Sequence, residues 1–348
     1  MNETRENRFL KALAVVFEKE EFLIGDCGVQ QKDFFSKENL KTDEFPAMVQ
    51  IGISNLCNLS CTECYHRVYK KRPDYKPTFM SMRIFEKVIY DMANFPSRTV
   101  LRFLSKGESL LHPNIIEMVM HAKNNLASPV ALITNGISLN KKISSSLLGT
   151  GIDVLDISLD AFTPDVYGMV RSNPELFSTV VDNVNNLVAM RDLGGFQTKV
   201  FVSFLMQPEN YEEKNNFEAY WSERVDKILY RKYHTYGGKI CQKPTPSKER
   251  FPCAALWNRI NVNERGLITR CYVDWDDQYI IGDLNVKGPT LLDIWKDKSF
   301  ENTRREHQDG KYTGLCEKCE GWQTAHWSIS YEKAIEMSLK KGKGGDHA

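Results

Sequence analysis

Apolar residues follow two alternating periods along the middle of the chain, and this alternation predicts an α/β fold. Short apolar runs rich in β-branched residues, such as "AMVQIGIS" from residue 47 and "PVALITN" at 129–135, are typical of buried strands. Between such runs, apolar residues recur three and four positions apart. At 81–95 they share one helical face behind Ser81, which is a suitable N-cap.

Six strands are predicted in this way, and helices separate them. Strict alternation predicts a parallel sheet with its crossovers outside, here a partial (β/α)6 barrel of the TIM type. Active sites of such barrels lie at the C-terminal ends of the strands. The predicted strands are 47–54, 99–105, 129–135, 153–160, 198–206 and 226–232, and the helices are 81–95, 112–125, 139–148, 174–193 and 210–225.

The pattern changes on both sides of this barrel. After it come short apolar runs, a probable hairpin turn at 264–266 and a helix around 290–307, which predict a smaller C-terminal α+β domain. The predicted organisation is an N-terminal helical extension at 1–46, the barrel at 47–235, a linker at 236–249, the small domain at 250–325, and a helix with a basic tail at 326–348.

Composition and charge narrow the function classes. The chain has 348 residues, is 42% hydrophobic and carries a net charge of +1, so no overall field favours nucleic acid or a membrane. It contains no apolar run near the roughly 20 residues of a membrane span, and its start does not resemble a signal peptide. We therefore expect a cytoplasmic protein. In that reducing compartment, clustered cysteines bind metal or perform chemistry more often than they form disulfides.

Cys57, Cys61 and Cys64 lie together in the loop after the first predicted strand. Zinc prefers four ligands and paired C-x2-C knuckles, whereas the spacing here is C-x3-C-x2-C. His66 could supply a fourth ligand only with strain, because it lies two residues beyond Cys64. Cysteine thiolates also hold iron–sulfur clusters, usually four for each 4Fe–4S cube. Three cysteines would leave one iron open for substrate or cofactor.

This "CNLSCTEC" segment resembles the cysteine loop of radical S-adenosylmethionine (SAM) enzymes. The resemblance implies a SAM-binding 4Fe–4S cluster whose open iron chelates SAM and whose reduction generates a 5′-deoxyadenosyl radical. It also implies reduced flavodoxin or ferredoxin as electron donor. The sequence departs from the family at Glu63, where an aromatic residue is frequent, and Tyr65 follows instead.

Three later strand ends carry further matches to the family. "SKGESLLHP" resembles its Gly-Gly-Glu-Pro segment, "LITNG" ends the third strand, and "ISLDAFTPDVYGMVR" resembles its fourth strand segment. A small residue lets backbone approach a ligand, and a carboxylate pairs with an ammonium group. Arg171 could pair with a carboxylate of SAM or substrate. The resemblance implies a cofactor site formed by Tyr65, Gly107, Glu108, Asn135, Ser158 and Asp160.

A second cysteine set lies in the small domain. Cys253 and Cys271 flank the predicted hairpin, and "CEKC" brings Cys316 and Cys319. On spacing alone, zinc would accept these four thiolates. The segment nevertheless resembles the SPASM/Twitch extension of radical SAM enzymes, in its shorter Twitch form. That resemblance implies a second, auxiliary 4Fe–4S cluster, closed by four cysteines and suited to electron transfer.

Three reactions remain open at this point. A small-molecule radical, of a sugar or an aminocyclitol, could lose a proton and an electron, which would make the protein a dehydrogenase. Cys241, in the linker, could return a hydrogen atom and make it an epimerase, or be a bystander thiol. A peptide substrate could be cross-linked. A two-zinc binding module is the distant alternative from another class.

Overall fold

The computed structural model describes residues 45–95, 99–104, 106–232, 236–237, 239, 250–323, 335 and 339. Almost all of the predicted N-terminal extension, most of the linker with Cys241, and Cys27 lie outside the described residues.

A nine-stranded sheet forms the centre of the molecule, in the order β6-β5-β4-β3-β2-β1-β7-β8-β9. The first six strands are parallel and lie in chain order, which confirms the predicted α/β class with its parallel sheet. They are β1 (Met48–Ile51), β2 (Val100–Phe103), β3 (Val130–Thr134), β4 (Val154–Ser158), β5 (Lys199–Met206) and β6 (Lys227–Lys232).

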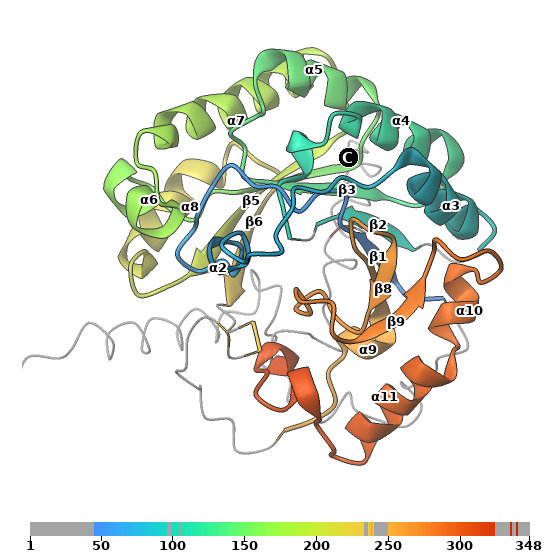
Figure 1. Ribbon diagram of the computed structural model, residues 1–348. Coiled ribbons are helices and arrows are strands. Elements are labelled where there is room, and N and C mark those ends of the chain that lie inside the picture. Colours follow the sequence, from blue (N-terminus) through green and yellow to red (C-terminus); the bar gives the residue numbers. More distant parts are fainter. Residues whose placement is uncertain are drawn as a thin grey trace, which may run out of the picture.

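Helices cover the outer face of these strands as a curved row, seen as the arc of Figure 1. The helix α6 was not predicted, although Thr163 caps it and Pro164 begins it. The row consists of α3 (Met82–Ala93), α4 (Ile115–Asn125), α5 (Lys141–Gly149), α6 (Pro164–Arg171), α7 (Leu176–Leu193) and α8 (Lys214–Trp221). Short elements join it, namely α2 (His66–Tyr69), η3 (Ser109–Leu111) and η4 (Tyr211–Glu213).

The two faces of the sheet carry different residues. On the outer face, Val49 and its equivalents pack into the large core under the helices. On the inner face, Met48, Val154 and Phe201 join one apolar cluster with Ile335. Two positions further along the same strands stand Gln50, Asp156 and Ser203, all buried and polar. The barrel interior is therefore apolar at its floor and polar toward the C-terminal ends of the strands.

The cysteine-rich C-terminal region continues the same sheet. β7 (Arg259–Val262) pairs in parallel with β1, and β8 (Leu267–Thr269) and β9 (Ile280–Asp283) follow as antiparallel strands. The predicted hairpin turn is present, with Gly266 at φ +77. In Figure 1 these orange strands lie beside β1 and β2. The C-terminal end of β7 therefore lies beside the C-terminal end of β1, at the same edge of the sheet as the other barrel strands.

The helix predicted around 290–307 was wrong as a single element. The structure has α10 (Leu291–Trp295) and α11 (Lys298–Gln308), because Asp297 leaves the helical conformation and caps the second helix. The remaining elements are α9 (Ala255–Asn258), η5 (Gly314–Cys316) and η6 (Gly321–Gln323).

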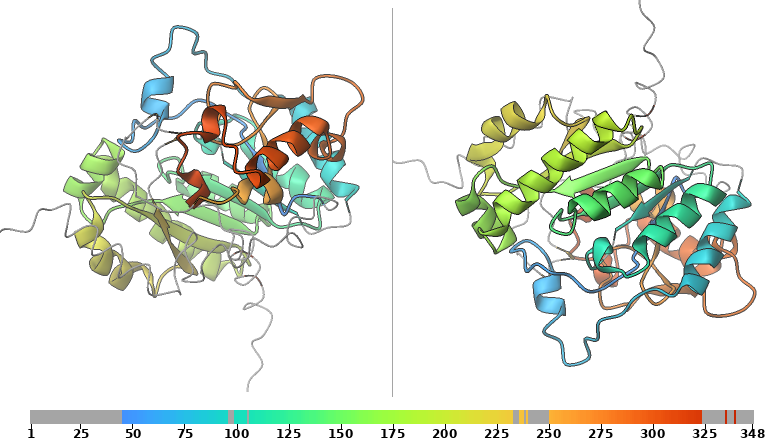
Figure 2. Two further views of the ribbon diagram at one scale, coloured as in Figure 1. Left: turned by 90° about the horizontal axis from the view of Figure 1, so that it is seen from below. Right: turned by 90° about the horizontal axis from the view of Figure 1, so that it is seen from above.

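The segment around α2 stands out from the body of the molecule in both views of Figure 2. The described part of the chain contains no helix that combines the length and apolarity of a membrane span.

Candidate functional site

The loop that leaves β1 holds Cys57, Cys61 and Cys64 close together. Burial raises the pKa of Cys61 well above its ordinary value. Negative charge on Cys57 and Cys64 raises the pKa of Cys61 further. Burial likewise raises the pKa of Cys64 to about 12. Three thiols that share a buried space need nearby positive charge to ionise. Iron bound to all three thiolates would supply that charge, so the donor set fits a cluster.

The thiols are not arranged around a single ion. Within the described ranges, no three Cys, His, Asp or Glu side chains come together closely enough to hold one metal ion. A zinc site would draw its sulfurs to about 2.3 Å from one centre. A cube places each cysteine on a different iron, and so tolerates a wider spacing.

The predicted Gly107 and Glu108 attach the end of β2 to the cysteine loop. The Glu108 amide donates to the Leu56 carbonyl at 2.8 Å. A Cβ atom on Gly107 would lie 2.5 Å from that same carbonyl oxygen, so only glycine permits the approach. The glycine thus serves close backbone packing at the cysteine loop.

Glu108 and the predicted Asn135 connect the next strand ends. The buried Glu108 carboxylate accepts the Asn135 amide at 2.8 Å and the Leu110 amide at 3.0 Å. The Asn135 side chain donates to Asn58, inside the cysteine loop, at 2.7 Å. One hydrogen-bond network therefore joins the ends of β1, β2 and β3. Ser158, which ends β4, stands half-buried at the same edge of the sheet.

Asp160 and Arg171 form a buried ion pair beside the cysteine loop. Asp160 has φ +62 and also accepts the Leu205 amide at 2.7 Å, which ties β4 to β5. Arg171 reaches from the end of α6, and its Nη1 lies 3.6 Å from the Cys61 sulfur. The resemblance suggested a carboxylate of SAM or substrate as the Arg171 partner; in the structure its partner is Asp160.

Glu63, the departure from the family pattern, is buried between these groups. Burial raises its pKa to about 7, against the opposing effect of Arg171. The Thr62 hydroxyl donates to it at 3.3 Å. The loop therefore places a carboxyl group, rather than an aromatic ring, next to Cys64.

Aromatic rings pack on the other side of the loop. Tyr65 lies 5.6 Å from Trp275 and 6.5 Å from Tyr236, measured between ring centroids. His66, considered as a strained fourth ligand, instead contacts the Asn55 carbonyl through Nε2 at 3.0 Å. Further along this segment, Arg72 pairs with Asp74 and Asp276.

The structure gathers the second cysteine set into one group. Burial raises the pKa of Cys271 well above its ordinary value, and charge on Cys253, Cys319 and Cys316 raises it further. Burial also raises the pKa of Cys253 to about 12. The four thiols come from the segment before α9, the loop after β8, η5 and the turn that follows it. Four thiols that affect one another's pKa values match the ligand number of a closed cluster.

Cations surround this second group. Arg270 contacts the Cys316 thiol and opposes the rise that burial causes in its pKa. Arg250 donates to the carbonyls of Cys316 and Glu317. The Cys253 amide donates to His307 Nδ1 at 3.3 Å, and burial lowers the pKa of His307 to about 4.

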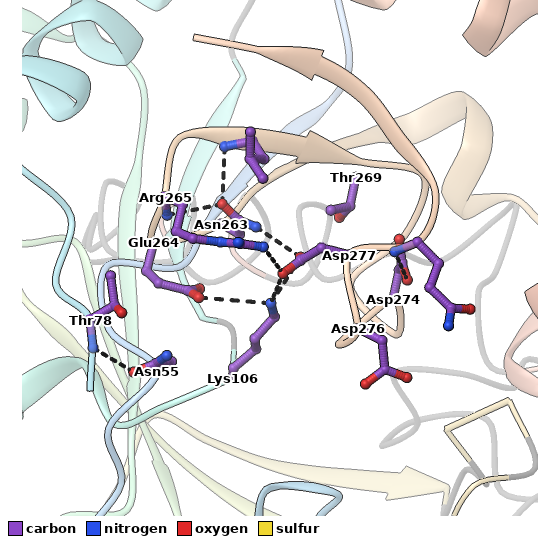
Figure 3. A network of polar contacts seen from close by, with 12 residues as sticks. Asn55, Thr78, Lys106, Asn263, Glu264, Arg265, Thr269, Asp274, Asp276 and Asp277 are labelled. Atoms are coloured by element: carbon purple, nitrogen blue, oxygen red, sulfur yellow. Dashed lines mark hydrogen bonds and ion pairs between the residues drawn. The ribbon is translucent and has the colours of Figure 1, made fainter. Parts of the chain in front are cut away.

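Sequence reasoning missed a polar cluster at the end of β7. Lys106, directly before Gly107, is buried and lies 2.8 Å from Asp277 and 3.8 Å from Glu264. Figure 3 shows these side chains converging from β2, the β7–β8 turn and the loop before β9. Only the pairing of β7 with β1 brings them together, and that pairing has no local sequence signal.

Two family models match the chain. The model described as the radical SAM superfamily matches residues 51–218, and SPASM, described as an iron–sulfur cluster-binding domain, matches residues 253–320. These models imply a SAM-binding 4Fe–4S cluster, an auxiliary cluster site and SAM itself. The two cysteine groups fall one in each matched region.

Curated relatives match about half of the chain. The tungsten-containing aldehyde ferredoxin oxidoreductase cofactor-modifying protein of Pyrococcus furiosus is 25% identical over 171 residues, covering 49% of this chain and 46% of that protein. The GTP 3′,8-cyclase of Limosilactobacillus fermentum is 25% identical over 196 residues, covering 55% of each. The chain thus spans about half the length of these relatives.

Solved structures share the fold over most of the chain. SuiB of Streptococcus suis, bound to precursor peptide SuiA, has a TM-score of 0.62 at 14% identity, covering 88% of this chain and 76% of SuiB. BtrN, in complex with AdoMet and 2-DOIA, has a TM-score of 0.55 at 16% identity, covering 80% of this chain and 94% of BtrN. At these identities the likeness concerns the fold.

Proposed function

We propose that this chain, which belongs to the radical SAM superfamily and carries an iron–sulfur SPASM domain, is a dehydrogenase of a small molecule. With its cofactors bound, the SAM site would supply a radical that removes a hydrogen atom from a substrate carbon. The auxiliary cluster would accept the remaining electron as the neighbouring O–H or N–H releases its proton to solvent. Cys57, Cys61 and Cys64 would hold the SAM-binding cluster, and Cys253, Cys271, Cys316 and Cys319 would hold the auxiliary cluster.

The chain's own residues have separable tasks in this proposal. Gly107 permits the approach of the Glu108 segment to the cysteine loop, where the Glu108 carboxylate would receive the SAM ammonium group. Asn135 and Ser158 would line the same cofactor site, and Tyr65 would close it from the aromatic side. Asp160 holds Arg171 against Cys61, which places a fixed positive charge beside the thiolates.

One observation favours oxidation of the substrate radical over epimerisation, namely the group of four thiols beside Arg250 and Arg270. Four thiolates leave no iron open for substrate, so such a site favours electron transfer over ligand binding. Positive charge nearby stabilises the reduced, more negative form of a cluster. Both features suit an electron acceptor. Cys241, the predicted hydrogen donor of an epimerase, lies outside the described residues.

Anaerobic reconstitution and isotope analysis test this proposal. We expect about eight irons and eight sulfides per chain, and 5′-deoxyadenosine in amounts that match product. A substrate incubated in heavy water should lose two mass units and gain no deuterium at carbon. One deuterium gained at carbon with no net loss of hydrogen would establish epimerisation. A colourless protein loaded with zinc would refute both reactions.

A further inference from the structure

A cavity of about 270 Å³ lies beside the candidate cofactor site, between the segment that follows the cysteine loop and the β7–β8 hairpin. One wall comes from the region of Asn55 to Thr78, and the other from the region of Glu264 to Asp277. Asn55 is two residues before Cys57, and Lys106 behind the opposite wall directly precedes Gly107. No predicted cofactor residue lines this cavity.

Glu264 gives the cavity its chemical character. Its side chain is 1% exposed, and the described residues provide its Oε2 atom with no hydrogen-bond partner. Its Oε1 atom forms an ion pair with Lys106 Nζ at 3.8 Å. A buried carboxylate oxygen without a donor is costly, and a ligand that brings a donor would remove that cost.

Glu264 shares its neighbouring cations with Asp277, and Lys106 lies closer to Asp277 than to Glu264. Lys106 Nζ lies 2.9 Å and 2.8 Å from the two Asp277 carboxylate oxygens, and Arg265 contacts the same group. Asn263 donates to Asp277 at 2.8 Å. Asp277 itself has an unfavourable φ of +51. Figure 3 shows Lys106 and Arg265 both directed at Asp277.

Aromatic rings complete the cavity wall. Tyr69 lies 5.5 Å from both Tyr75 and Trp275 between ring centroids, in edge-to-face contacts. All three rings line the cavity with Glu264. Lys106 Nζ lies 5.5 Å and the Arg72 guanidinium carbon 5.7 Å from the centroid of the Tyr69 ring. A ligand amine would therefore meet the rings of Tyr75 and Trp275, where cation–π contact adds to a charge-assisted hydrogen bond.

We propose that this cavity binds a small molecule or side chain through its protonated amine, with Glu264 Oε2 accepting the hydrogen bond and the three rings surrounding the carbon next to nitrogen. The inference rests on the proposed function only in taking the bound amine to be the substrate. Lys76 also lines the cavity, so an anionic ligand is the alternative to exclude.

Binding to the anaerobically reconstituted full chain, in the presence of SAM, tests the proposal. The calorimetric probes are glucosamine, neutral glucose, glucose 6-phosphate, and a capped lysine peptide with its norleucine counterpart. We expect one of the two amines to bind at least tenfold more tightly than its neutral counterpart. Preference for glucosamine identifies a small-molecule amine, and preference for the lysine peptide identifies a peptide side chain.

The variant Glu264→Gln should lower amine affinity roughly 10- to 100-fold and leave the affinity for the neutral probes unchanged. Lys106 keeps its contact with Asp277 in this variant, so we expect the fold to persist, as the thermal transition would report. Glu86→Gln, the same substitution at an exposed position of α3, is the matched control and should bind like the wild type.

Three outcomes would overturn the proposal: tighter binding of glucose 6-phosphate, equal amine binding by Glu264→Gln and wild type, or no amine binding up to about 10 mM. These results are separable from the reaction itself. A wild-type chain that cleaves SAM but binds neither amine rejects this inference alone. Amine binding to a zinc-loaded, colourless protein rejects the proposed function alone.

Discussion

The two cysteine groups differ in how they are built and in the charge around them. The first lies in one short loop, where burial, Glu63 and Glu108 raise the pKa values of the thiols and Arg171 opposes them. The second is assembled from distant segments, and Arg250 and Arg270 oppose the rise that burial causes. Acidic surroundings favour the oxidised state of a cluster, and basic surroundings favour the reduced state.

This contrast gives electron flow a direction. A cluster surrounded by carboxyl groups is a stronger reductant, as the cleavage of SAM requires. A cluster surrounded by arginines is a better acceptor, as the oxidation of a substrate radical requires. Arg171 and Lys70 are cations near the first group, and Asp160 pairs with Arg171. The comparison therefore supports the proposal that the two cysteine groups have different roles.

The largest expected effect comes from removing the first cysteine group, because only that group is expected to bind SAM. Replacing Cys57, Cys61 and Cys64 by Ala together should abolish 5′-deoxyadenosine formation, because SAM then has no cluster to bind. About four irons should remain in the auxiliary site. Chromatographic assay of 5′-deoxyadenosine and iron analysis check this. Continued SAM cleavage in the triple variant would remove the basis for distinguishing the two sites.

Cys271→Ala should have the converse effect. We expect SAM cleavage to continue, while product formation falls at least about 100-fold because the electron has no acceptor, a barrier increase of about 2.7 kcal/mol. The ratio of 5′-deoxyadenosine to product, measured by mass spectrometry, reports this uncoupling. Equal losses of both compounds would mean that the auxiliary site supports the fold rather than the oxidation.

Gly107→Ala should weaken SAM binding at the first group only. The added Cβ would lie 2.5 Å from the Leu56 carbonyl oxygen, so the Glu108 segment must move off the cysteine loop. A loss of one or two hydrogen bonds corresponds to about 10- to 100-fold in affinity. Equilibrium dialysis with SAM measures it. Gly149→Ala in α5, where an added Cβ meets nothing within 4 Å, is the control and should bind SAM normally.

The sequence predicted features whose signals are local. The six parallel strands are apolar runs, and the first cysteine group is a contiguous motif, so both were visible without structure. The helix α6 also had a local signal in Thr163-Pro164, an N-cap followed by a proline suited to the first helical turn, which the prediction did not use. The single helix predicted at 290–307 failed because the cap at Asp297 was overlooked.

The sequence could not predict features that depend on distant pairing. β7 lies next to β1 although some two hundred residues separate them, and short strands of similar composition carry no register information. The buried contact of Lys106 with Glu264 and Asp277 follows from that pairing. The position of the two cavity walls also follows from that pairing. The cofactor site was therefore visible in the sequence, whereas the proposed amine site required the structure.

The smallest expected effect tests the charge contrast itself. Arg270→Gln removes a cation and a hydrogen-bond donor from Cys316, so the auxiliary cluster should become harder to reduce. A charge-assisted hydrogen bond of about 1.5 kcal/mol corresponds to roughly 60 mV for one electron. Redox titration followed by electron paramagnetic resonance measures this downward shift in potential.

The exposed Arg305→Gln on α11, whose partner is Glu301, is the matched control for Arg270→Gln and should leave both potentials unchanged. The SAM-site cluster should keep its potential in either variant, because Arg270 acts on the other cysteine group. An auxiliary potential that stays within about 10 mV of wild type would show that the arginines position the peptide chain around Cys316 without directing the electron. The contrast between the two sites would then rest on the number of their cysteines alone.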